Sequence, residues 1–357
     1  MKDKAETFLE LKGLTKKFGE FTAVSEVDLQ IAEGEFFTLV GPSGSGKTTM
    51  IRLLVGMDLP TSGDIILKGT RLNDVPANKR PTCMVFQNLA LFPHRNVGEN
   101  IEFPLKIAKV APAVRRERAM ALLEQLHLPL DFYDKGVNQC SGGERQRVAL
   151  ARALAFDPEI LFFDEPLSAL DFRLRKALEK ELKDIHRETG KTFVYITHSL
   201  EEAMVMSDRI GIMKDGALVQ IGTPNEIYNK PINKFVAQFM GEVNTLEVEA
   251  AGDMTVRDIK GEGTFEVKSM PDQFSRGYLI VRPEVMKLGP AASGLPNIMH
   301  GKFFNDYALG SRMQYQIRSP SGDQWLVERL QDEVFDGTFG DTVALGWRPE
   351  DSILVSE

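Results

Sequence analysis

One segment of the chain combines glycines, hydroxyl side chains and a lysine in a spacing that suits phosphate binding. Residues 41–48 read Gly-Pro-Ser-Gly-Ser-Gly-Lys-Thr, which fits the pattern G-x-x-x-x-G-K-[ST]. In that pattern the glycines let backbone N–H groups surround the phosphates, Lys47 reaches the β- and γ-phosphates, and the Thr48 hydroxyl binds Mg²⁺. The segment predicts a nucleoside triphosphate site whose contacts are Gly41, Ser43, Gly44, Ser45, Gly46, Lys47, Thr48 and Thr49.

Two adjacent carboxylates follow an apolar segment farther along the chain. Residues 160–166 read Ile-Leu-Phe-Phe-Asp-Glu-Pro, so the acids stand at the carboxyl end of an expected buried strand, where open α/β sheets bind ligands. Asp164 can hold Mg²⁺ directly or through water, and Glu165 can orient and deprotonate an attacking water. Such a pair alone is most often a solvated turn, but beside a phosphate loop it predicts a hydrolytic site.

A third segment offers a second site for an anion. Residues 140–147 read Cys-Ser-Gly-Gly-Glu-Arg-Gln-Arg and precede an apolar helical stretch. The free N–H groups at the start of that helix, together with the Ser141 hydroxyl, would face an anion. An ordinary helix cap explains the serine and one glycine. It does not explain two phosphate sites in a chain whose only phosphate-loop lysine is Lys47.

The elements that must position these segments follow an α/β pattern. Three continuous apolar segments predict buried strands at 36–40, 160–163 and 192–197. Apolar residues at helical spacing predict helices over 114–127 and 168–188, the second closed by a glycine. Strands that alternate with helices indicate a mainly parallel sheet with helices on both faces.

The pattern changes after about residue 241. Helical spacing gives way to short alternating segments separated by Gly, Pro and Asp, which predict an all-β domain over 241–357. Within it, Arg-Pro-Glu follows an expected strand at both 282–284 and 348–350, which indicates a duplicated β unit or two similar turns. This region holds 11 basic and 19 acidic side chains and so carries the whole formal charge of −8. We therefore expect a neutral domain over 1–240 and an acidic one over 241–357.

Composition excludes several classes of protein. No stretch of 18 apolar residues is present to span a membrane, and the polar first residues do not form a secretory signal. The two cysteines, Cys83 and Cys140, cannot build a disulfide framework and suit a reducing compartment. Without a basic block, nucleic acid is not an expected partner. The expected setting is cytosolic.

The order and intervals of these motifs resemble the nucleotide-binding subunit of ABC transporters. Residues 141–146, Ser-Gly-Gly-Glu-Arg-Gln, match the signature motif of that family, and the resemblance extends from residue 8 to about 240. It implies an α/β P-loop NTPase with a RecA-like core, an antiparallel β subdomain and a helical subdomain at about 88–155. It also implies a homodimer arranged head to tail that hydrolyses ATP with Mg²⁺. Each ATP would lie between the phosphate loop of one subunit and Ser141, Gly142 and Gly143 of the partner subunit.

Four further positions acquire roles from this resemblance. Phe18 corresponds to an aromatic residue that stacks on adenine, although a core position is the alternative. Gln87 corresponds to a glutamine that contacts Mg²⁺ and the attacking water, the alternative being a solvated loop amide. Asp171 corresponds to a dimer contact in the loop 168–171, and His198 to a histidine that senses the γ-phosphate rather than a structural histidine. The implied catalytic residues are Glu165, His198 and Gln87, and the implied Mg²⁺ ligands are Thr48, Gln87 and Asp164.

Two positions depart from the family pattern. Cys140 stands where leucine is usual and should pack as a small apolar side chain. Ser199 follows His198 where relatives of this type commonly carry aspartate, which removes one possible charge beside the histidine. Neither position has to bind phosphate, so we expect an active ATPase.

The remaining features resemble those of importers. Segment 91–105 resembles the surface on which membrane-spanning permease subunits dock, although a buried linker is the alternative. The β domain resembles the OB-like TOBE domain of bacterial importer ATPases, and segments 222–228 and 235–244 are most similar to the spermidine/putrescine branch. The resemblance implies a peripheral protein on the cytoplasmic face of the bacterial inner membrane. Its implied partners are two permease subunits and, indirectly, a periplasmic or extracellular solute-binding protein, and the implied cargo is a polyamine.

Alternatives to polyamine import stay open from the sequence. The same motifs would serve import of ferric iron, phosphonate, sulfate or a sugar. A soluble ABC ATPase of translation or DNA repair would share them too, but it would normally carry two tandem cassettes or a long coiled coil. A regulatory module that binds nucleotide without turnover would be expected to lack Glu165, which is present.

Overall fold

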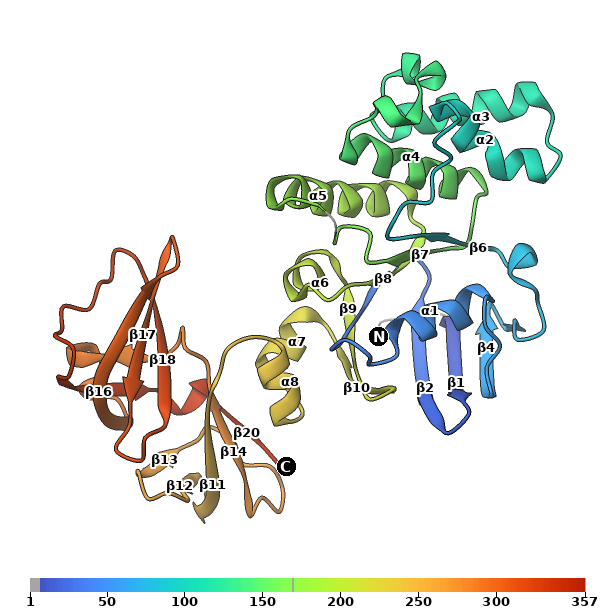
Figure 1. The fold of residues 1–357 in the computed structure, drawn as a ribbon. Coiled ribbons are helices and arrows are strands. Elements are labelled where there is room, and N and C mark those ends of the chain that lie inside the picture. Colours follow the sequence, from blue (N-terminus) through green and yellow to red (C-terminus); the bar gives the residue numbers. More distant parts are fainter. Residues whose placement is uncertain (1–6, 169, 357) are drawn as a thin grey trace, which may run out of the picture. The chain divides into compact units, whose positions relative to one another are not determined.

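The computed structural model describes residues 7–168 and 170–356 and divides into two compact units, Met1–Pro224 and Asn225–Glu357 (Figure 1). Residues 225–240, which the sequence pattern assigns to the first domain, group with the second unit by their contacts. Within the described ranges, no helix combines the length and the apolar character that crossing a membrane requires.

An antiparallel sheet begins the first unit. β1 (Thr7–Phe18) and β2 (Phe21–Ala32) form a hairpin, and β4 (Ser62–Leu67) and β5 (Thr70–Arg71) extend the sheet in the order β2-β1-β4-β5. Every second residue along much of β2 is buried and apolar, as expected for strands with one face on the core.

A six-stranded sheet in the order β10-β9-β3-β8-β7-β6 forms the centre of the first unit. Its parallel strands are β3 (Phe36–Val40), β6 (Thr82–Val85), β7 (Ile160–Asp164), β8 (Thr192–Ile196) and β9 (Arg209–Lys214). β10 (Ala217–Gly222) pairs antiparallel at one edge. The structure confirms the three predicted buried strands and the parallel sheet.

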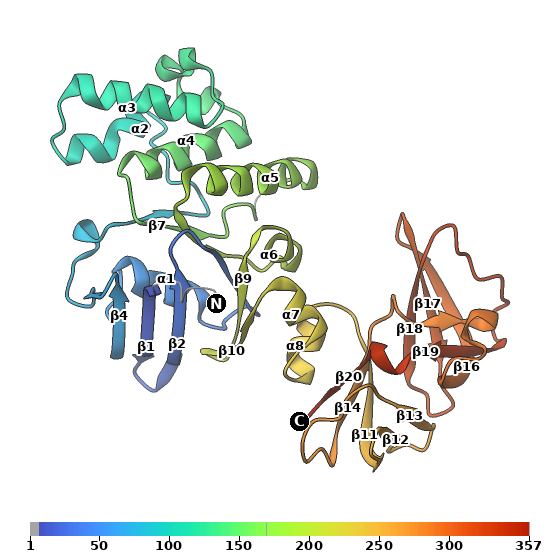
Figure 2. The same ribbon diagram turned by 180° about the vertical axis from the view of Figure 1, so that it is seen from behind.

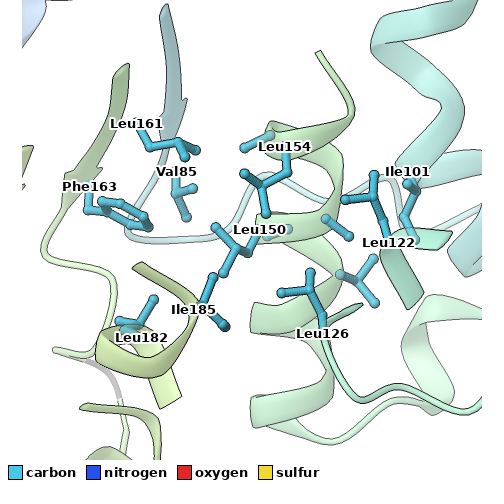
Figure 3. Packing of buried hydrophobic residues seen from close by; sticks show 14 of the residues in the cluster. Val85, Ile101, Leu122, Leu126, Leu150, Leu154, Leu161, Phe163, Leu182 and Ile185 are labelled. Atoms are coloured by element: carbon cyan, nitrogen blue, oxygen red, sulfur yellow. The ribbon is translucent and has the colours of Figure 1, made fainter. Parts of the chain in front are cut away.

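Helices cover one face of this sheet, and a helix with the antiparallel sheet covers the other. α4 (Gly142–Ala155) and α5 (Phe172–Thr189) pack on one face, where Phe163 of β7 lies among their apolar side chains (Figure 3). Phe193 of β8 belongs to the same buried cluster. The neighbouring residue of each strand points the opposite way, toward α1 (Lys47–Val55), β1 and β2. Burial on both faces explains why these strands are apolar without alternation.

A helical part extends from the first of these faces. α2 (Val97–Ile107) and α3 (Pro112–Gln125) pack with α4, and Figure 3 shows Ile101, Leu122 and Leu126 from α2, α3 and the residue after it gathered near α4. α3 begins two residues before the prediction, because proline fits the first turn of a helix. The last helix of the unit is α6 (Leu200–Met206), which follows β8.

α5 begins later than the prediction of 168–188. The side chain of Asp171 accepts a hydrogen bond from the backbone N–H of Leu174 at 3.1 Å and so caps the helix at Phe172. The predicted stripe on α5 is buried at Leu178, Leu182 and Ile185, and Gly190 ends the helix in the left-handed conformation.

The second unit contains two five-stranded antiparallel sheets, which confirms the predicted all-β domain. The first has the order β13-β12-β11-β14-β20, and the second has the order β15-β19-β16-β17-β18. Their strands are β11 (Asn244–Gly252), β12 (Thr255–Asp258), β13 (Thr264–Glu266), β14 (Arg276–Val281), β15 (Lys287–Leu288), β16 (Asn297–Ala308), β17 (Arg312–Arg318), β18 (Gln324–Leu330), β19 (Thr342–Trp347) and β20 (Ser352–Val355).

The two sheets exchange their last strands. After β14 the first Arg-Pro-Glu segment leads to β15, which pairs with β19 of the second sheet. After β19 the second Arg-Pro-Glu segment leads to β20, which pairs with β14 of the first sheet (Figure 2). The repeated segment therefore marks the crossing point of a duplicated five-strand unit. This agrees with the interpretation of the repeat as a duplicated β unit rather than two similar turns.

Matching hydrogen bonds confirm the duplication. Asn244 opens β11, and its side chain bonds to both the backbone N–H and C=O of Leu326 at 2.7 and 2.8 Å. Asn297 opens β16, and its side chain makes the same two bonds to Glu266 at 2.7 and 2.9 Å. Each asparagine thus ties the first strand of one copy to the third strand of the other.

One arginine of the repeat holds two short helices against the β unit. α7 (Pro224–Asn229) and α8 (Lys234–Phe239) precede β11. The buried guanidinium of Arg282 donates to the carbonyl oxygens of Tyr228 at 3.0 Å and Ala237 at 3.1 Å and lies 4.0 Å above the Tyr228 ring. These contacts explain why residues 225–240 group with the second unit.

Candidate nucleotide-binding site

The phosphate loop joins β3 to α1, in the strand–loop–helix context that the motif requires. Gly44 and Gly46 have φ angles of 79° and 99°, a left-handed region that favours glycine. A Cβ at Gly46 would lie 2.2 Å from the carbonyl oxygen of Ala23, and one at Gly41 would lie 2.3 Å from that of Met213. Glycine at these positions therefore lets the loop pack closely against its neighbours.

Lys47 is buried in the first turn of α1. Its Nζ donates to the carbonyl oxygens of Gly41 at 2.7 Å and Pro42 at 2.9 Å. Burial lowers the pKa of Lys47, and the negative charges of Glu165 and Asp164 oppose that shift. The ammonium group is thus held inside the loop, where phosphate oxygens can replace the carbonyls as charge-assisted acceptors.

The paired carboxylates lie at the end of β7, as predicted. Burial, with the added charge of Glu165, raises the pKa of Asp164. Glu165 has a φ of 46°, a left-handed conformation that costs a residue with a side chain about 1–3 kcal/mol. Its N–H donates to the carbonyl oxygen of Ile196 at 2.9 Å, which helps to hold that conformation. The backbone therefore aims the Glu165 side chain away from the strand direction.

His198 faces Glu165. Its Nδ1 lies 3.1 Å from Glu165 Oε2, and its side chain is 62% exposed, whereas that of Glu165 is 25% exposed. The two residues come from the ends of neighbouring strands β8 and β7, so the parallel register of the sheet brings them together. An acid and an imidazole at this distance can share or transfer a proton.

Gln87 joins this group through a hydroxyl. Its Nε2 donates to the Ser168 Oγ at 2.9 Å, and that hydroxyl donates to the carbonyl oxygen of Glu165 at 2.9 Å. The segment after β6 is thereby tied to the turn that follows β7. Sequence reasoning did not anticipate the role of Ser168, because it depends on two segments 81 residues apart.

A cavity of about 640 Å³ brings most of the predicted residues together. It is lined by Phe21, Ala23, Ser43, Gly44, Ser45, Gly46, Lys47, Thr48, Thr49, Glu165 and His198. Phe21 and Ala23 are additions to the sequence prediction. The loop N–H groups, the lysine and the acid therefore face one space large enough for phosphates.

Two phenylalanines stand at the β1–β2 turn beside this cavity. Phe18 and Phe21 are paired across the turn, and they are 50% and 63% exposed. Phe21 lines the cavity, whereas the Phe18 ring carries the Lys16 ammonium 4.8 Å from its centroid. The exposure of Phe18 argues against the alternative of a core residue. A two-residue turn pairs the residues on its two sides, so Gly19-Glu20 was the signal in the sequence that could have placed Phe21 opposite Phe18.

The predicted Mg²⁺ ligands offer a suitable set of donor atoms. Thr48, Gln87 and Asp164 supply a hydroxyl, an amide oxygen and a carboxylate, the oxygen ligands that Mg²⁺ prefers. Burial and the charge of Glu165 raise the pKa of Asp164, and the positive charge of Lys47 offsets only part of that shift. A divalent cation beside it would favour the ionised form, so the residues fit the metal.

The signature segment forms the start of α4. The Ser141 hydroxyl accepts a hydrogen bond from the Glu144 N–H at 3.3 Å, and the Glu144 carboxylate accepts one from the Ser141 N–H at 2.7 Å. This capping box shows that the serine does cap the helix, as the alternative interpretation held. A Cβ at Gly143 would lie 3.2 Å from Leu174, so the helix start packs on α5. Gly142 opens the same helix.

The remaining predicted positions have structural contacts in the described residues. Asp171 caps α5 and is exposed, while Ala169 of the same predicted loop lies outside the described residues. Cys140 is buried in the core cluster, as expected for an apolar replacement of leucine. Ser199 caps α6 by accepting the Glu202 N–H at 3.3 Å, a function for which a carboxylate is not required.

Segment 91–105 is partly exposed rather than a buried linker. Phe92 and Phe103 pack with ring centroids 4.5 Å apart, and the Arg95 guanidinium covers both rings at 5.3 and 5.4 Å. Pro93 and His94 are exposed at the turn before α2. The segment therefore presents a firm turn on the surface of the helical part.

Comparison with known proteins agrees with this geometry. The sequence model of the ABC transporter family matches residues 24–168, and that of the TOBE domain matches residues 279–355. The spermidine/putrescine import ATP-binding protein PotA of Nitrosomonas eutropha is 42% identical, with 88% of this chain and 89% of the relative covered. The protein of the same name from Chromobacterium violaceum is 41% identical, with 98% and 99% covered.

Solved structures give the same result for the first unit. A dimeric ATP-binding cassette in a post-hydrolysis state, bound to ADP and Pi, is 37% identical, with a TM-score of 0.53, and covers 60% of this chain and 98% of its own. The cbiO1 protein of Clostridium perfringens, part of an ABC transporter complex, is 26% identical, with a TM-score of 0.58, and covers 62% and 91%. This chain therefore belongs to the ABC transporter family, as an ATPase subunit that carries a C-terminal TOBE domain.

Proposed function

We propose that this chain powers the import of polyamines, with spermidine and putrescine as the cargo. The observation that carries the proposal is identity near 40% over nearly the whole chain with several proteins named for that import. The match includes the β unit, so it goes beyond the cassette that all ABC ATPases share. The cavity and the loop account for the energy source, and they do not distinguish one cargo from another.

Hydrolysis is proposed to proceed by direct attack of water on the γ-phosphate. Lys47 leaves the carbonyl oxygens of its own loop to bind phosphate oxygens, joined by the loop N–H groups. Glu165 is proposed to accept the proton of the attacking water, and His198, whose Nδ1 lies 3.1 Å from that carboxylate, is proposed to contact the γ-phosphate. Gln87 is placed by Ser168 next to the Glu165 turn, where its amide can orient the water.

Mg²⁺ would be held by Thr48, Gln87 and Asp164. When bound, it would neutralise phosphate charge and so favour departure of the γ-phosphate. Asp164 supplies the only carboxylate of this set, and it ends β7 directly before Glu165, so the end of one strand would position both the metal and the base.

The complete site is proposed to form in a head-to-tail homodimer. Ser141 is exposed at the start of α4, where the free N–H groups of a helix N-terminus attract phosphate. Gly142 and Gly143 of the partner subunit would approach the ATP without side chains in the way. Asp171, exposed at the start of α5, is proposed as a contact between the subunits.

Coupling to transport is proposed to occur at segment 91–105, on which two permease subunits would dock. Its exposed turn and packed rings form the surface on which a helix of the permease is proposed to dock. The proposed location is the cytoplasmic face of the bacterial inner membrane, with a solute-binding protein on the other side.

Uptake of labelled polyamine tests the cargo. Cells that lack this chain should lose uptake of labelled putrescine and spermidine, and the wild-type chain should restore it, whereas Lys47→Ala should not. Uptake of sulfate, phosphonate, ferric iron and maltose by the same cells serves as the control. Normal polyamine uptake with loss of one control solute would contradict the proposed cargo and identify another.

Substitution of the base tests the mechanism. Glu165→Gln keeps the shape of the side chain but removes its proton-accepting charge, so hydrolysis should fall about 10²–10⁴-fold while ATP binding persists. Phosphate release and the binding of a fluorescent ATP analogue measure the two effects separately. Hydrolysis at the normal rate would exclude Glu165 as the base.

A further inference from the structure

A buried carboxylate is hydrogen-bonded to the segment that carries His198. Glu202, on α6, is 2% exposed, and its Oε2 accepts hydrogen bonds from the hydroxyls of Tyr195 and Thr197, both at 2.8 Å. None of these three residues belongs to the predicted site, and no motif of the nucleotide pocket includes Glu202. Burying a carboxylate costs free energy unless the group is well paired, so the presence of Glu202 at this position calls for an explanation.

The bonds of Glu202 fix the backbone on both sides of His198. The Thr197 hydroxyl, which donates to Glu202, also accepts the N–H of Ser199 at 2.9 Å. The Ser199 hydroxyl in turn accepts the N–H of Glu202 at 3.3 Å. The residues before and after His198 are thus tied to one carboxylate, while the imidazole itself stays exposed.

A guanidinium extends this network toward the loop after β7. Arg175, on α5, has its Nε 3.9 Å from Glu202 Oε1, and its Nη2 donates to the carbonyl oxygen of Leu170 at 2.8 Å. Leu170 lies in the loop that leads from Glu165 to α5. α5 and α6 lie side by side, so the link crosses directly from one to the other (Figure 2).

We propose that Glu202 is a positioning residue for ATP hydrolysis, which holds His198 against Glu165 and joins that pair through Arg175 to the loop before α5. The proposal rests on the proposed role of His198. Glu202 itself is buried and does not line the nucleotide cavity, so it is not proposed to contact ATP. It acts because Glu165 and His198 stand on separate loops whose side chains lie 3.1 Å apart. Glu202 is hydrogen-bonded to Thr197 beside His198 and forms an ion pair with Arg175, which in turn bonds to Leu170 of the other loop.

Two hydroxyls on the same carboxylate oxygen provide a matched pair of variants. Thr197→Val removes the donor to Glu202 and also the acceptor for Ser199, so the segment around His198 is released. Tyr195→Phe removes an equivalent donor at the same distance, but its hydroxyl has no bond to that segment. Each variant removes one hydrogen-bond donor to the Glu202 carboxylate, so the resulting loss of stability should be similar for Thr197→Val and Tyr195→Phe.

The experiment measures kcat, KM for ATP and melting temperature of the full-length chain. Thr197→Val should lower kcat about tenfold or more, because misplacement of a catalytic group by about 1 Å can cost up to about a hundredfold. KM for ATP should stay within about twofold, since the phosphate loop is untouched. Tyr195→Phe should lower the melting temperature comparably and leave kcat near that of the wild type.

Glu202→Gln and His198→Ala complete the test. Glu202→Gln should reproduce the kcat defect of Thr197→Val, and the double variant Thr197→Val with Glu202→Gln should fall little further, since both break one network. Equal kcat values for wild type and Thr197→Val, with His198→Ala inactive, would overturn the positioning role alone. Wild-type kcat for His198→Ala would remove the proposed role of His198 and this inference with it. Equal kcat losses for Thr197→Val and Tyr195→Phe would reduce the network to ordinary packing.

Discussion

Replacing Arg282 by methionine should destabilise the C-terminal unit, whereas the same change at Arg348 should not. The two arginines occupy equivalent places in the duplicated unit, at the start of each Arg-Pro-Glu segment. Arg282 is 4% exposed and bonds to the last turns of α7 and α8. The Arg348 side chain is 65% exposed, and its ion pair with Glu350 spans 3.9 Å. The two variants therefore compare the loss of a buried arginine with the loss of an exposed one at equivalent positions of the repeat.

The expected magnitude follows from the two lost bonds. A hydrogen bond to a charged group is worth about 1.5–3 kcal/mol, and Arg282 makes two to carbonyl oxygens. Burial of the guanidinium, which also lowers the pKa of Arg282, offsets part of this. We expect a net loss of about 3 kcal/mol in the free energy of unfolding for Arg282→Met, against at most about 0.5 kcal/mol for Arg348→Met.

The two tryptophans make the measurement specific to this unit. Trp325 and Trp347 are the only tryptophans of the chain, both are buried in the β unit, and their rings stack at 5.6 Å. Urea unfolding followed by tryptophan emission therefore reports this unit alone. With a slope of about 2 kcal/mol per M, the midpoint of Arg282→Met should fall by about 1.5 M.

Three results would refute the reasoning. An unchanged midpoint for Arg282→Met would mean that the two carbonyl bonds contribute nothing net. Equal shifts for both variants would assign the effect to the Arg-Pro-Glu turn rather than to the helices. A lower slope without a lower midpoint would point to the unfolded state instead of the contacts of Arg282.

Three further predictions concern the nucleotide site and the thiols. Lys47→Ala should weaken ATP binding at least about tenfold in a fluorescent-nucleotide titration, because the charge-assisted phosphate bonds are lost, and unchanged affinity would exclude this loop as the phosphate site. Gly46→Ala should lower the melting temperature more than Gly44→Ala, since its Cβ would meet the Ala23 oxygen at 2.2 Å whereas that of Gly44 meets nothing within 4 Å, and similar melting temperatures would contradict the steric argument. Burial raises the pKa of Cys83 to about 11. Alkylation of this thiol in the folded protein at pH 8 should therefore be roughly two-hundredfold slower than that of a free thiol, and its rate should rise about tenfold per pH unit up to pH 10. An alkylation rate that stays flat above pH 9 would exclude the raised pKa.

Much of the nucleotide site could be predicted because its residues are neighbours in sequence. The phosphate loop and the acids after β7 are continuous segments, so residue type and spacing alone indicated their chemistry. The buried strands were equally clear, since burial on both faces of the parallel sheet leaves continuous apolar runs such as Phe36–Val40.

Contacts between distant segments could not be predicted. One example is the hydrogen bond of Gln87 to Ser168, and another is the pair of contacts that Arg175 makes with Leu170 and Glu202. These contacts depend on how the turns after separate strands meet. The start of α5 moved to Phe172 because a side-chain cap, rather than the apolar stripe, decides where a helix begins. Phe21 was overlooked in favour of Phe18, although a two-residue turn places the two rings together.

The β unit shows the same division. The repeated Arg-Pro-Glu was visible in the sequence, but its meaning as a crossing between two sheets required pairing partners between 57 and 77 residues apart. Arg282 is buried and Arg348 is exposed because α7 and α8 cover only one of the two copies, and this difference could not be predicted from the repeat itself.

The exchanged strands impose an order of events on the synthesis of this chain. The first sheet gains β20 at its edge only after residues 352–355 have been made, and by then the ribosome has produced the whole second sheet. The first copy, β11–β15, therefore cannot complete its hydrogen bonding during its own translation, because β14 and β15 pair with strands of the second copy. Pairing across so long an interval is slow, because the ends of a long loop must first meet. Until then the unpaired edge of β14 is open to pairing with the wrong strand.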